Sequence, residues 1–279
     1  MSAAHVPHSP APLLTAQGLA KAFGGVQAVD GVSFSLQAGE LLALIGPNGA
    51  GKSTCFNLIN GQLPPDAGRV QLGGHDITGL RPRAIWRLGV GRTFQVAATY
   101  ASMTVVENVQ MALLSHYDCL RQWWPRAAAL YREQALELLT AVGLRERADE
   151  PCSTLAYGDI KTVELAIALA NSPRLLLMDE PTAGMAPRER GALMELTRRL
   201  AKERDIGVLF TEHSMDVVFA HADRIMVLAR GRLIADGPPA QIRDDERVRE
   251  VYLGSGRLLQ ARAVVSGAAG SSTRQEGPR

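Results

Sequence analysis

Short apolar runs alternate with amphipathic segments along most of the chain. Four of these runs are continuous rather than alternating, at residues 41–45, 175–178, 206–210 and 225–228. Strands covered on both faces have this pattern, whereas a strand with one face in water alternates apolar and polar residues. The alternation of such strands with helices predicts a central parallel sheet joined by crossover helices.

Helical spacing occurs between and around these runs. Leu193, Leu196 and Leu200 recur on one helix face. Because Pro187 suits a first helical turn, a crossover helix is predicted over 187–204. Two further helices are predicted over 54–60 and 160–170.

Residues 96–158 lack strong strand runs and contain helical signals instead. Thr104 and Glu107 form a capping box before a helix predicted over 105–114, and a second helix is predicted over 127–142. This stretch is therefore predicted to be a helical lobe inserted into the sheet-forming part of the chain.

Segments that alternate around Gly-rich turns, at 13–36 and 68–77, predict antiparallel strands beside the parallel core. The predicted organisation is a core in two parts with the helical lobe between them, a flexible leader and a mobile tail. In residue numbers these are 13–95 and 159–254 for the core, 96–158 for the lobe, 1–12 for the leader and 255–279 for the tail.

The composition excludes several classes of protein. Apolar residues make up 46% of the 279 residues and charged residues 21%, as in a folded globular chain and unlike a disordered one. The formal charge of +2 is too small for a protein that binds nucleic acid through bulk charge, and the apolar runs are far shorter than the roughly 20 residues that span a bilayer. Cys55, Cys119 and Cys152 form no Cys-x-x-Cys pair, which favours a reducing cytosol over a zinc site.

A glycine-rich motif directly follows the run 41–45 and directly precedes the helix predicted over 54–60. It fits the pattern G-x-x-x-x-G-K-[ST] with Gly46, Pro47, Asn48, Gly49, Ala50, Gly51, Lys52, Ser53 and Thr54. The glycines let backbone N–H groups point inward around an anion, and the helix N-terminus adds positive potential. Lys52 can then reach the outer phosphates of a nucleotide, and the Ser53 hydroxyl suits Mg²⁺. An ordinary Gly-rich turn is the alternative.

The run 175–178 ends in two carboxylates, Asp179 and Glu180. Beside a phosphate loop, the first carboxylate can hold Mg²⁺, usually through water, and the second can polarise an attacking water. A solvated strand end is the alternative. The presence of Lys52 in the same chain favours the catalytic interpretation.

The order of these motifs resembles that of the nucleotide-binding subunits of ATP-binding-cassette (ABC) transporters, from about residue 13 to residue 254. Gln95 stands where the family has a glutamine that senses Mg²⁺ and couples to membrane subunits. His213 stands where the family has a histidine that holds the γ-phosphate and the attacking water beside the carboxylate matching Glu180. Phe23 stands where an aromatic residue stacks on adenine, with a core Phe as the alternative.

This resemblance implies a fold and an activity. The fold is of the α/β class, a P-loop NTPase with a central mostly parallel sheet, a flanking antiparallel β-subdomain and an inserted α-helical lobe. The activity is hydrolysis of ATP to ADP and phosphate, coupled to transport, with Mg²⁺ as cofactor.

The family signature Leu-Ser-Gly-Gly-Gln is expected after the helical segment, and this chain has Leu155, Ala156, Tyr157, Gly158 and Asp159 there. In the family this motif contacts the ATP held by a facing cassette, so the resemblance implies a second cassette as partner. Ala156 removes the serine hydroxyl, and Ala186 replaces the acidic residue of the family's D-loop. Backbone donors at Gly158 and the following helix still form an anion site. The negative charge of Asp159 suits the helix dipole but opposes phosphate, and the sequence leaves the balance open.

Four further segments are similar to cassettes of branched-chain amino-acid importers, at residues 23–29, 180–185, 212–218 and 251–254. The resemblance implies uptake of hydrophobic amino acids, or of a related small solute such as urea or an amide. It also implies two membrane permease subunits, a periplasmic or extracellular solute-binding protein that acts indirectly, and a peripheral position on the cytoplasmic face of the membrane. No nucleic-acid partner is expected.

Two other classes of protein remain as alternatives. A soluble cassette ATPase of the DNA-repair or translation-factor type usually has a long coiled-coil insertion or tandem cassettes, and this sequence has neither. An ATP-gated scaffold that barely hydrolyses ATP is favoured by Ala156 and Ala186 but opposed by the lysine, carboxylates and histidine described above. The pair Trp123-Trp124 has two interpretations, contact with a membrane subunit or lipid headgroups and packing inside the lobe.

Overall fold

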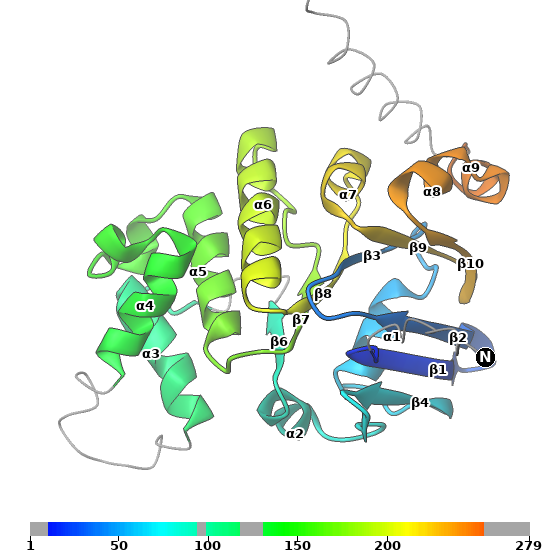
Figure 1. Cartoon of the computed structure of the whole chain (residues 1–279), viewed down its shortest axis with the longest axis horizontal. Helices are drawn as coiled ribbons and strands as arrows, with labels where there is room; N and C mark the ends of the chain where they lie inside the picture. Colours follow the sequence, from blue (N-terminus) through cyan, green and yellow to red (C-terminus); the bar gives the residue numbers. More distant parts are fainter. Residues whose placement is uncertain (1–10, 94–98, 118–130, 254–279) are drawn as a thin grey trace, which may run out of the picture.

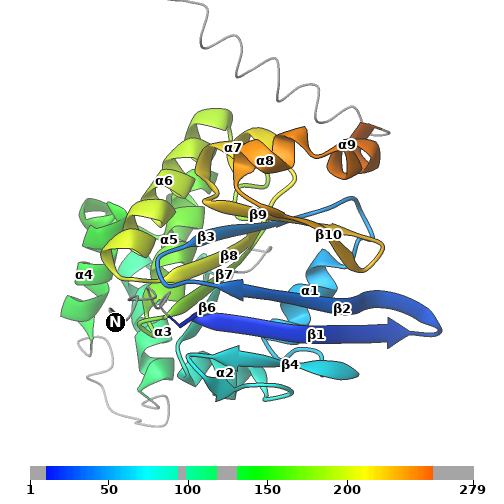
Figure 2. The same ribbon diagram turned by 45° about the vertical axis from the view of Figure 1, so that its right-hand side comes forward.

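A computed structural model describes residues 11–93, 99–117 and 131–253 (Figure 1). The described chain forms two sheets that lie side by side, with helices packed over the larger sheet and grouped at one end (Figures 1 and 2). Gln95, the Trp123-Trp124 pair, the predicted tail and most of the predicted leader lie outside the described residues.

The larger sheet has the strand order β10-β9-β3-β8-β7-β6. Its strands are β3 (Leu41–Ile45), β6 (Val90–Thr93), β7 (Leu175–Asp179), β8 (Gly207–Thr211), β9 (Arg224–Ala229) and β10 (Arg232–Gly237). All neighbouring pairs are parallel except β9 with β10. The four continuous apolar runs lie in β3, β7, β8 and β9, which confirms the predicted mostly parallel sheet.

The smaller sheet has the order β2-β1-β4-β5, and its pairs are antiparallel. Its strands are β1 (Leu14–Phe23), β2 (Val26–Leu36), β4 (Ala67–Leu72) and β5 (His75–Asp76). These strands fall in the two segments with alternating pattern, so the predicted antiparallel subdomain is confirmed.

Strand β3 shows why the parallel sheet is apolar on both faces. Leu41, Ala43 and Ile45 belong to a core formed with the helices that cover one face, whereas Leu42 and Leu44 belong to a core formed with α1 and the smaller sheet. Side chains alternate between the two faces of a strand, so a strand between two cores must be apolar at every position.

Of the helices in the described residues, those that begin at Lys52, Val105, Arg132, Tyr157 and Pro187 lie close to their predicted ranges, and the other four are not predicted from the sequence. The helices are α1 (Lys52–Ile59), α2 (Pro82–Arg87), α3 (Val105–His116), α4 (Arg132–Val142), α5 (Tyr157–Leu169), α6 (Pro187–Glu203), α7 (Met215–His221), α8 (Pro239–Asp244) and α9 (Glu246–Leu253), with short 3₁₀ turns η2 (Arg145–Arg147) and η3 (Cys152–Thr154). The predicted capping box of Thr104 and Glu107 is present at the start of α3. The helix predicted from residue 160 begins earlier, at Tyr157.

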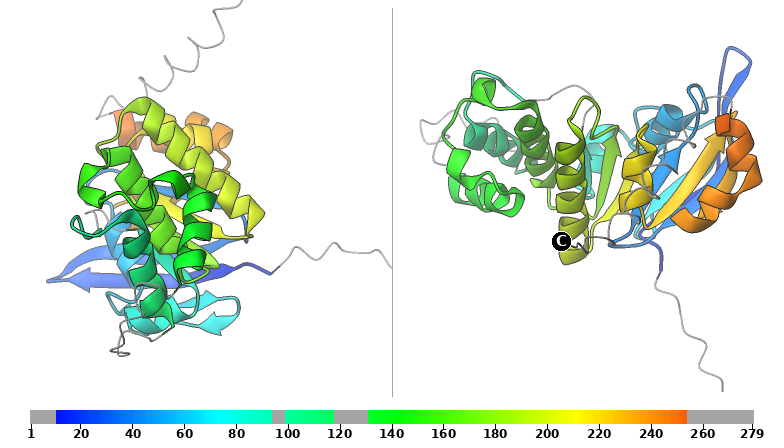
Figure 3. Two further views of the ribbon diagram at one scale, coloured as in Figure 1. Left: turned by 90° about the vertical axis from the view of Figure 1, so that its left-hand side faces the viewer. Right: turned by 90° about the horizontal axis from the view of Figure 1, so that it is seen from above.

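Helices α3, α4 and α5 pack against one another and form the group at one end of the molecule, where α5 also contacts β6, and α6 lies between α5 and α7 (Figures 1 and 3). Helix α4 ends at Gly143, whose φ of +81° is the left-handed conformation that ends many helices. The first four residues of the helix predicted over 127–142 lie outside the described residues.

Candidate functional site

The glycine-rich loop connects β3 to α1, and close backbone approach requires glycine at two of its positions. A Cβ added at Gly46 would lie 2.3 Å from the carbonyl oxygen of Leu228, and one at Gly51 would lie 2.2 Å from that of Ala28. Gly51 also has a φ of +103°, which side-chain-bearing residues rarely adopt. The neighbouring strands β9 and β2 therefore hold the loop in its curved conformation.

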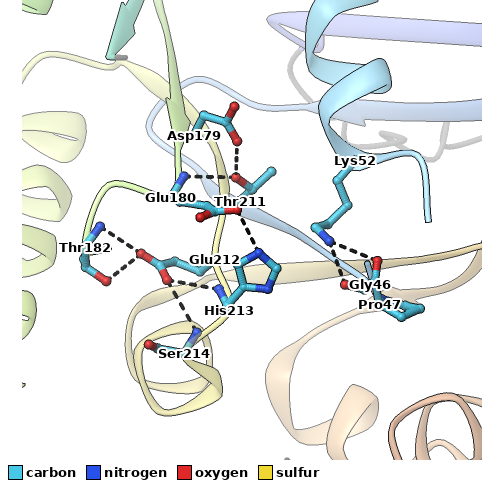
Figure 4. A network of polar contacts seen from close by, with 10 residues as sticks. All are labelled: Gly46, Pro47, Lys52, Asp179, Glu180, Thr182, Thr211, Glu212, His213 and Ser214. Atoms are coloured by element: carbon cyan, nitrogen blue, oxygen red, sulfur yellow. Dashed lines mark hydrogen bonds and ion pairs between the residues drawn. The ribbon is translucent and has the colours of Figure 1, made fainter. Parts of the chain in front are cut away.

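Lys52 is the first residue of α1, and its ammonium group lies inside this loop. Its Nζ donates hydrogen bonds to the carbonyl oxygens of Gly46 at 2.7 Å and Pro47 at 3.1 Å (Figure 4). A buried cation and a helix N-terminus at the same point create a site for an anion. The other predicted loop residues lie on the curve and the first turn of α1, and they are Asn48, Gly49, Ala50, Ser53 and Thr54.

The predicted carboxylates stand at the end of β7, beside the end of β8. The Thr211 hydroxyl donates to Asp179 Oδ1 at 2.7 Å and accepts from the backbone N–H of Glu180 at 3.0 Å. Glu180 has a φ of +50°, uncommon for a residue with a side chain, and its bonds to Thr211 hold it there. Arg92 on β6 lies 3.8 Å from Asp179 Oδ2. Burial lowers the pKa of Arg92, and the charge of Asp179 opposes this effect.

Glu180 and His213 contact each other directly. His213 Nε2 lies 2.7 Å from Glu180 Oε1, and the two side chains are 35% and 23% exposed (Figure 4). Both groups are thus accessible to water while held in one geometry. Strands β3, β8 and β7 are neighbours, so the loop around Lys52, the carboxylates and the histidine meet at the carboxyl edge of one sheet.

The sequence interpretation missed three residues that support this site, Arg92, Thr211 and Glu212. Glu212 is the clearest omission, because its carboxylate is buried beside the candidate histidine and accepts hydrogen bonds from residues on two loops (Figure 4). The sequence does indicate this residue, because Glu212 is a charged residue between an apolar strand and the candidate histidine His213.

The segment that matches the signature motif lies at the start of α5. Ala156 is the N-cap of this helix and provides no side-chain hydrogen bond. Asp159 forms an ion pair with Arg147, so its negative charge is balanced within the chain. The exposed ring of Tyr157 lies over Gly184, where an added Cβ would be 3.4 Å from the ring. Leu155 is buried before the helix, and Gly158 lies in its first turn.

Phe23 ends β1 and is 46% exposed, so it is not a core residue. It pairs with Val26 across the hairpin between β1 and β2. Two residues further along β2, Ala28 approaches the glycine-rich loop at Gly51. The exposed ring therefore belongs to a hairpin that contacts the glycine-rich loop.

This fold and this set of residues define the class of ATP-hydrolysing cassettes that drive transport. The profile of the family described as ABC transporter matches residues 29–183, more than half of the chain, and the chain belongs to this family. Residues 232–257 match the family described as branched-chain amino acid ATP-binding cassette transporter, which places the chain in that group. The predicted fold, family and ATPase activity are thereby confirmed. In the described part of the chain, the helices are too short or too polar to span a membrane.

Individual relatives are ATP-binding proteins of more than one transport system. The chain is 38% identical over 250 residues to the high-affinity branched-chain amino acid transport ATP-binding protein BraF of Pseudomonas aeruginosa, covering 87% of this chain and 98% of that protein. It is 37% identical over 243 residues to the lipopolysaccharide export system ATP-binding protein LptB of Escherichia coli, covering 86% and 97%.

Two solved structures show the same fold. The ADP conformation of an ATP-binding cassette of an ABC transporter has a TM-score of 0.77 at 32% identity and covers 88% of this chain and 100% of its own. A dimeric post-hydrolysis state of another cassette, bound to ADP and Pi, has a TM-score of 0.68 at 25% identity and covers 81% and 98%. Cassettes of this family therefore bind nucleotide and dimerise.

Proposed function

We propose that this chain energises the uptake of branched-chain or other hydrophobic amino acids, or of a related small solute such as urea or an amide. The observation that carries the proposal is the match of residues 232–257 to the branched-chain family. Overall identity does not decide the solute, because it is nearly the same to BraF as to LptB, which is named for lipopolysaccharide export.

Reconstitution into proteoliposomes tests the solute. The chain would be combined with two permease subunits and a solute-binding protein of a branched-chain amino-acid importer. We expect leucine, isoleucine or valine to stimulate ATP hydrolysis and to accumulate across the membrane, and lysine, as a control, to do neither. Stimulation by urea or an amide alone would select the second solute class, and stimulation by lipopolysaccharide would contradict the proposal.

Glu180 is proposed as the general base of hydrolysis. Its carboxylate is water-accessible and 2.7 Å from His213, which supports a role of the histidine in holding the carboxylate, the water and the γ-phosphate together. Lys52 and the loop N–H groups would stabilise the negative charge that develops on the γ-phosphate. The attacking water would give its proton to Glu180, the bond between the β- and γ-phosphates would break, and ADP and phosphate would leave.

The oxygen donors near the loop fit Mg²⁺. Asp179 offers a carboxylate and Ser53 an exposed hydroxyl, and Mg²⁺ prefers oxygen ligands while keeping several waters. Among the described residues, no three His, Cys, Asp or Glu gather as a metal site. The ion is proposed to bind together with the nucleotide. Gln95 is proposed as a further ligand on the family resemblance. When bound, Mg²⁺ supplies positive charge to the phosphate oxygens.

A second cassette, identical or related, is proposed to complete each ATP site through residues 155–159. Three observations support this role. The first turn of α5 has backbone donors without a side-chain cap, the Tyr157 ring is exposed, and Arg147 balances the charge of Asp159. In this proposal residues 13–95 and 159–254 form the nucleotide-binding core, and residues 96–158 form the lobe.

Two membrane permease subunits are proposed to dock beside residues 96–103, which would place the cassette at the cytoplasmic face of the membrane. A cavity of about 460 Å³ lies between the end of α1, α2, the end of α3 and β6, the strand that precedes this segment in the sequence. Trp86, Arg83 and Ser115 contribute to its lining. This combination of an aromatic ring with polar groups supports the docking of a short helix from a membrane subunit.

Replacement of Phe23 by alanine is expected to raise the Kd for ATP about 10-fold, because stacking of a base on an aromatic ring contributes about 1–3 kcal/mol. Phe23→Trp keeps a ring and is expected to bind ATP within about twofold of wild type. Since the side chain is exposed, neither change should alter folding. Titration with a fluorescent ATP analogue measures both variants. Equal affinity of Phe23→Ala and wild type would show that the ring does not contact adenine.

A further inference from the structure

Two loop segments flank the contact between Glu180 and His213. Residues 182–185 follow Glu180 after one proline, and residues 212–214 contain His213. Neither segment is part of a helix or a strand. The position of His213 relative to Glu180 therefore depends on what holds the two segments together.

Glu212 provides the first link between these segments. Its carboxylate is 3% exposed, and Oε1 accepts from the backbone N–H of Thr182 at 3.0 Å and from the Thr182 hydroxyl at 2.6 Å. Oε2 accepts from the backbone N–H of His213 at 3.1 Å and, more weakly, from that of Ser214 at 3.4 Å (Figure 4). One carboxylate oxygen thus binds the segment after Glu180, and the other binds the segment that carries His213.

Arg190 provides the second link from the opposite side. It lies in the first turns of α6, and its Nε donates to the carbonyl oxygen of Met185 at 2.8 Å. Its NH1 donates to the Ser214 hydroxyl at 2.9 Å, and Ser214 is the N-cap of α7. A single guanidinium group therefore contacts both segments.

We propose that Glu212 and Arg190 are positioning residues for ATP hydrolysis, which fix His213 against Glu180 by tying segment 182–185 to segment 212–214. This inference rests on the proposed roles of Glu180 and His213. Segment 182–185 also lies under the exposed ring of Tyr157 at Gly184. The two residues therefore connect His213 to the part of the chain that is proposed to face a second cassette.

The chemistry of each link depends on its residue type. A carboxylate only accepts hydrogen bonds, so Glu212 can accept from all four donors around it. The NH₂ group of a glutamine is itself a donor, so on one of the two segments it would point at other donors and form no hydrogen bond with them. The guanidinium group holds several donors in a fixed plane and can reach a carbonyl oxygen and a hydroxyl at once. A lysine ammonium at position 190 is a point donor on a flexible stem and is expected to keep only one of the two contacts.

The first test measures steady-state ATP hydrolysis by the purified full-length chain. We expect Glu212→Gln and Arg190→Ala to lower kcat about 10-fold or more while KM for ATP stays within about twofold, because neither residue contacts the phosphate loop. Arg190→Lys is expected to restore part of kcat. Arg199→Ala is the matched control, since Arg199 also lies on α6 and donates to a backbone carbonyl, that of Ala141 at 3.0 Å, but away from these segments. It is expected to leave kcat unchanged.

The second test is a double-mutant cycle with His213→Ala. If Glu212 acts through His213, then Glu212→Gln should cause no further loss of kcat in the His213→Ala background. A general structural weakening would instead lower kcat by the same factor in both backgrounds and lower the melting temperature. If Glu212→Gln does not fold, the same cycle is measured with Arg190→Ala. This variant is expected to fold, because the Arg190 side chain is partly exposed.

The outcomes separate this inference from the proposed function. If His213→Ala hydrolyses ATP at the wild-type rate, the proposed role of His213 is wrong, and the positioning role of Glu212 and Arg190 is then wrong as well. If His213→Ala is impaired but Glu212→Gln and Arg190→Ala match Arg199→Ala, or combine additively with His213→Ala, then only the positioning role is wrong. Impaired kcat with a non-additive cycle supports it.

Discussion

Replacement of Glu180 by glutamine is expected to lower Mg²⁺-dependent ATP hydrolysis by about 10²–10⁴-fold, the usual contribution of a general base. The amide keeps the size of the side chain and can still contact His213, but it cannot take the proton of the attacking water. ATP affinity should change little, because the loop around Lys52 is untouched. Since ATP then persists, the variant should form a dimer in the presence of ATP and Mg²⁺. Phosphate release and size-exclusion chromatography measure the two effects.

A matched control is Glu195→Gln, which neutralises an exposed carboxylate on α6 and should hydrolyse ATP normally. The same comparison decides the scaffold alternative that Ala156 and Ala186 raise. If wild type and Glu180→Gln hydrolyse ATP equally slowly when assembled with the membrane subunits, Glu180 is not the general base and the chain acts as an ATP-gated scaffold.

Replacement of Gly51 by alanine is expected to abolish tight ATP binding, with a rise in Kd of roughly 100-fold or more, and to lower the free energy of unfolding by about 2–5 kcal/mol. The added Cβ would lie 2.2 Å from the carbonyl oxygen of Ala28, which is backbone and cannot rotate away. Either β2 or the loop must move, and movement of the loop turns its N–H groups away from the phosphates. Isothermal titration with ATP and chemical denaturation measure the two quantities.

Gly143→Ala is the control for backbone strain alone. Gly143 has a φ of +81°, but an added Cβ would meet no atom within 4 Å, and the residue ends α4 in the helical group. The change is expected to lower the free energy of unfolding by about 1 kcal/mol without altering ATP affinity. If Gly51→Ala changes ATP affinity and the free energy of unfolding only as much as Gly143→Ala does, then the close approach of Ala28 does not determine the conformation of the loop.

The charge of Asp159 shows how the structure changes a conclusion left open by the sequence. Beside a helix N-terminus, a carboxylate both suits the dipole and repels phosphate. Arg147 stands twelve residues earlier in the sequence, and η2 brings its guanidinium group to the carboxylate. The positive charge of Arg147 therefore counteracts the repulsion between Asp159 and a phosphate. The ion pair of Arg147 with Asp159 therefore supports the proposal that residues 155–159 contact the ATP of a facing cassette.

Helix α5 begins at Tyr157, three residues before the start that the sequence predicts. Helix starts are recognised in sequence from side chains that cap them, and Ala156 has none. By contrast, the start of α3 was predicted correctly because Thr104 and Glu107 satisfy the backbone through side chains only three residues apart.

The sequence by itself determined β3, β7, β8 and β9 of the larger sheet, the glycine-rich loop and the two carboxylates after β7, because each depends on residues that are contiguous or regularly spaced. A run of five apolar residues specifies a strand buried on both faces, and the loop carries its chemistry in nine consecutive positions. The tertiary structure alone decided how Glu180 is held and what surrounds His213. Thr211, Glu212 and Arg190 contact partners between 1 and 32 residues away in the sequence, at the end of β7 and on the loops that connect β7 to α6 and β8 to α7. Such contacts have no fixed spacing along a chain, so only the folded geometry reveals them.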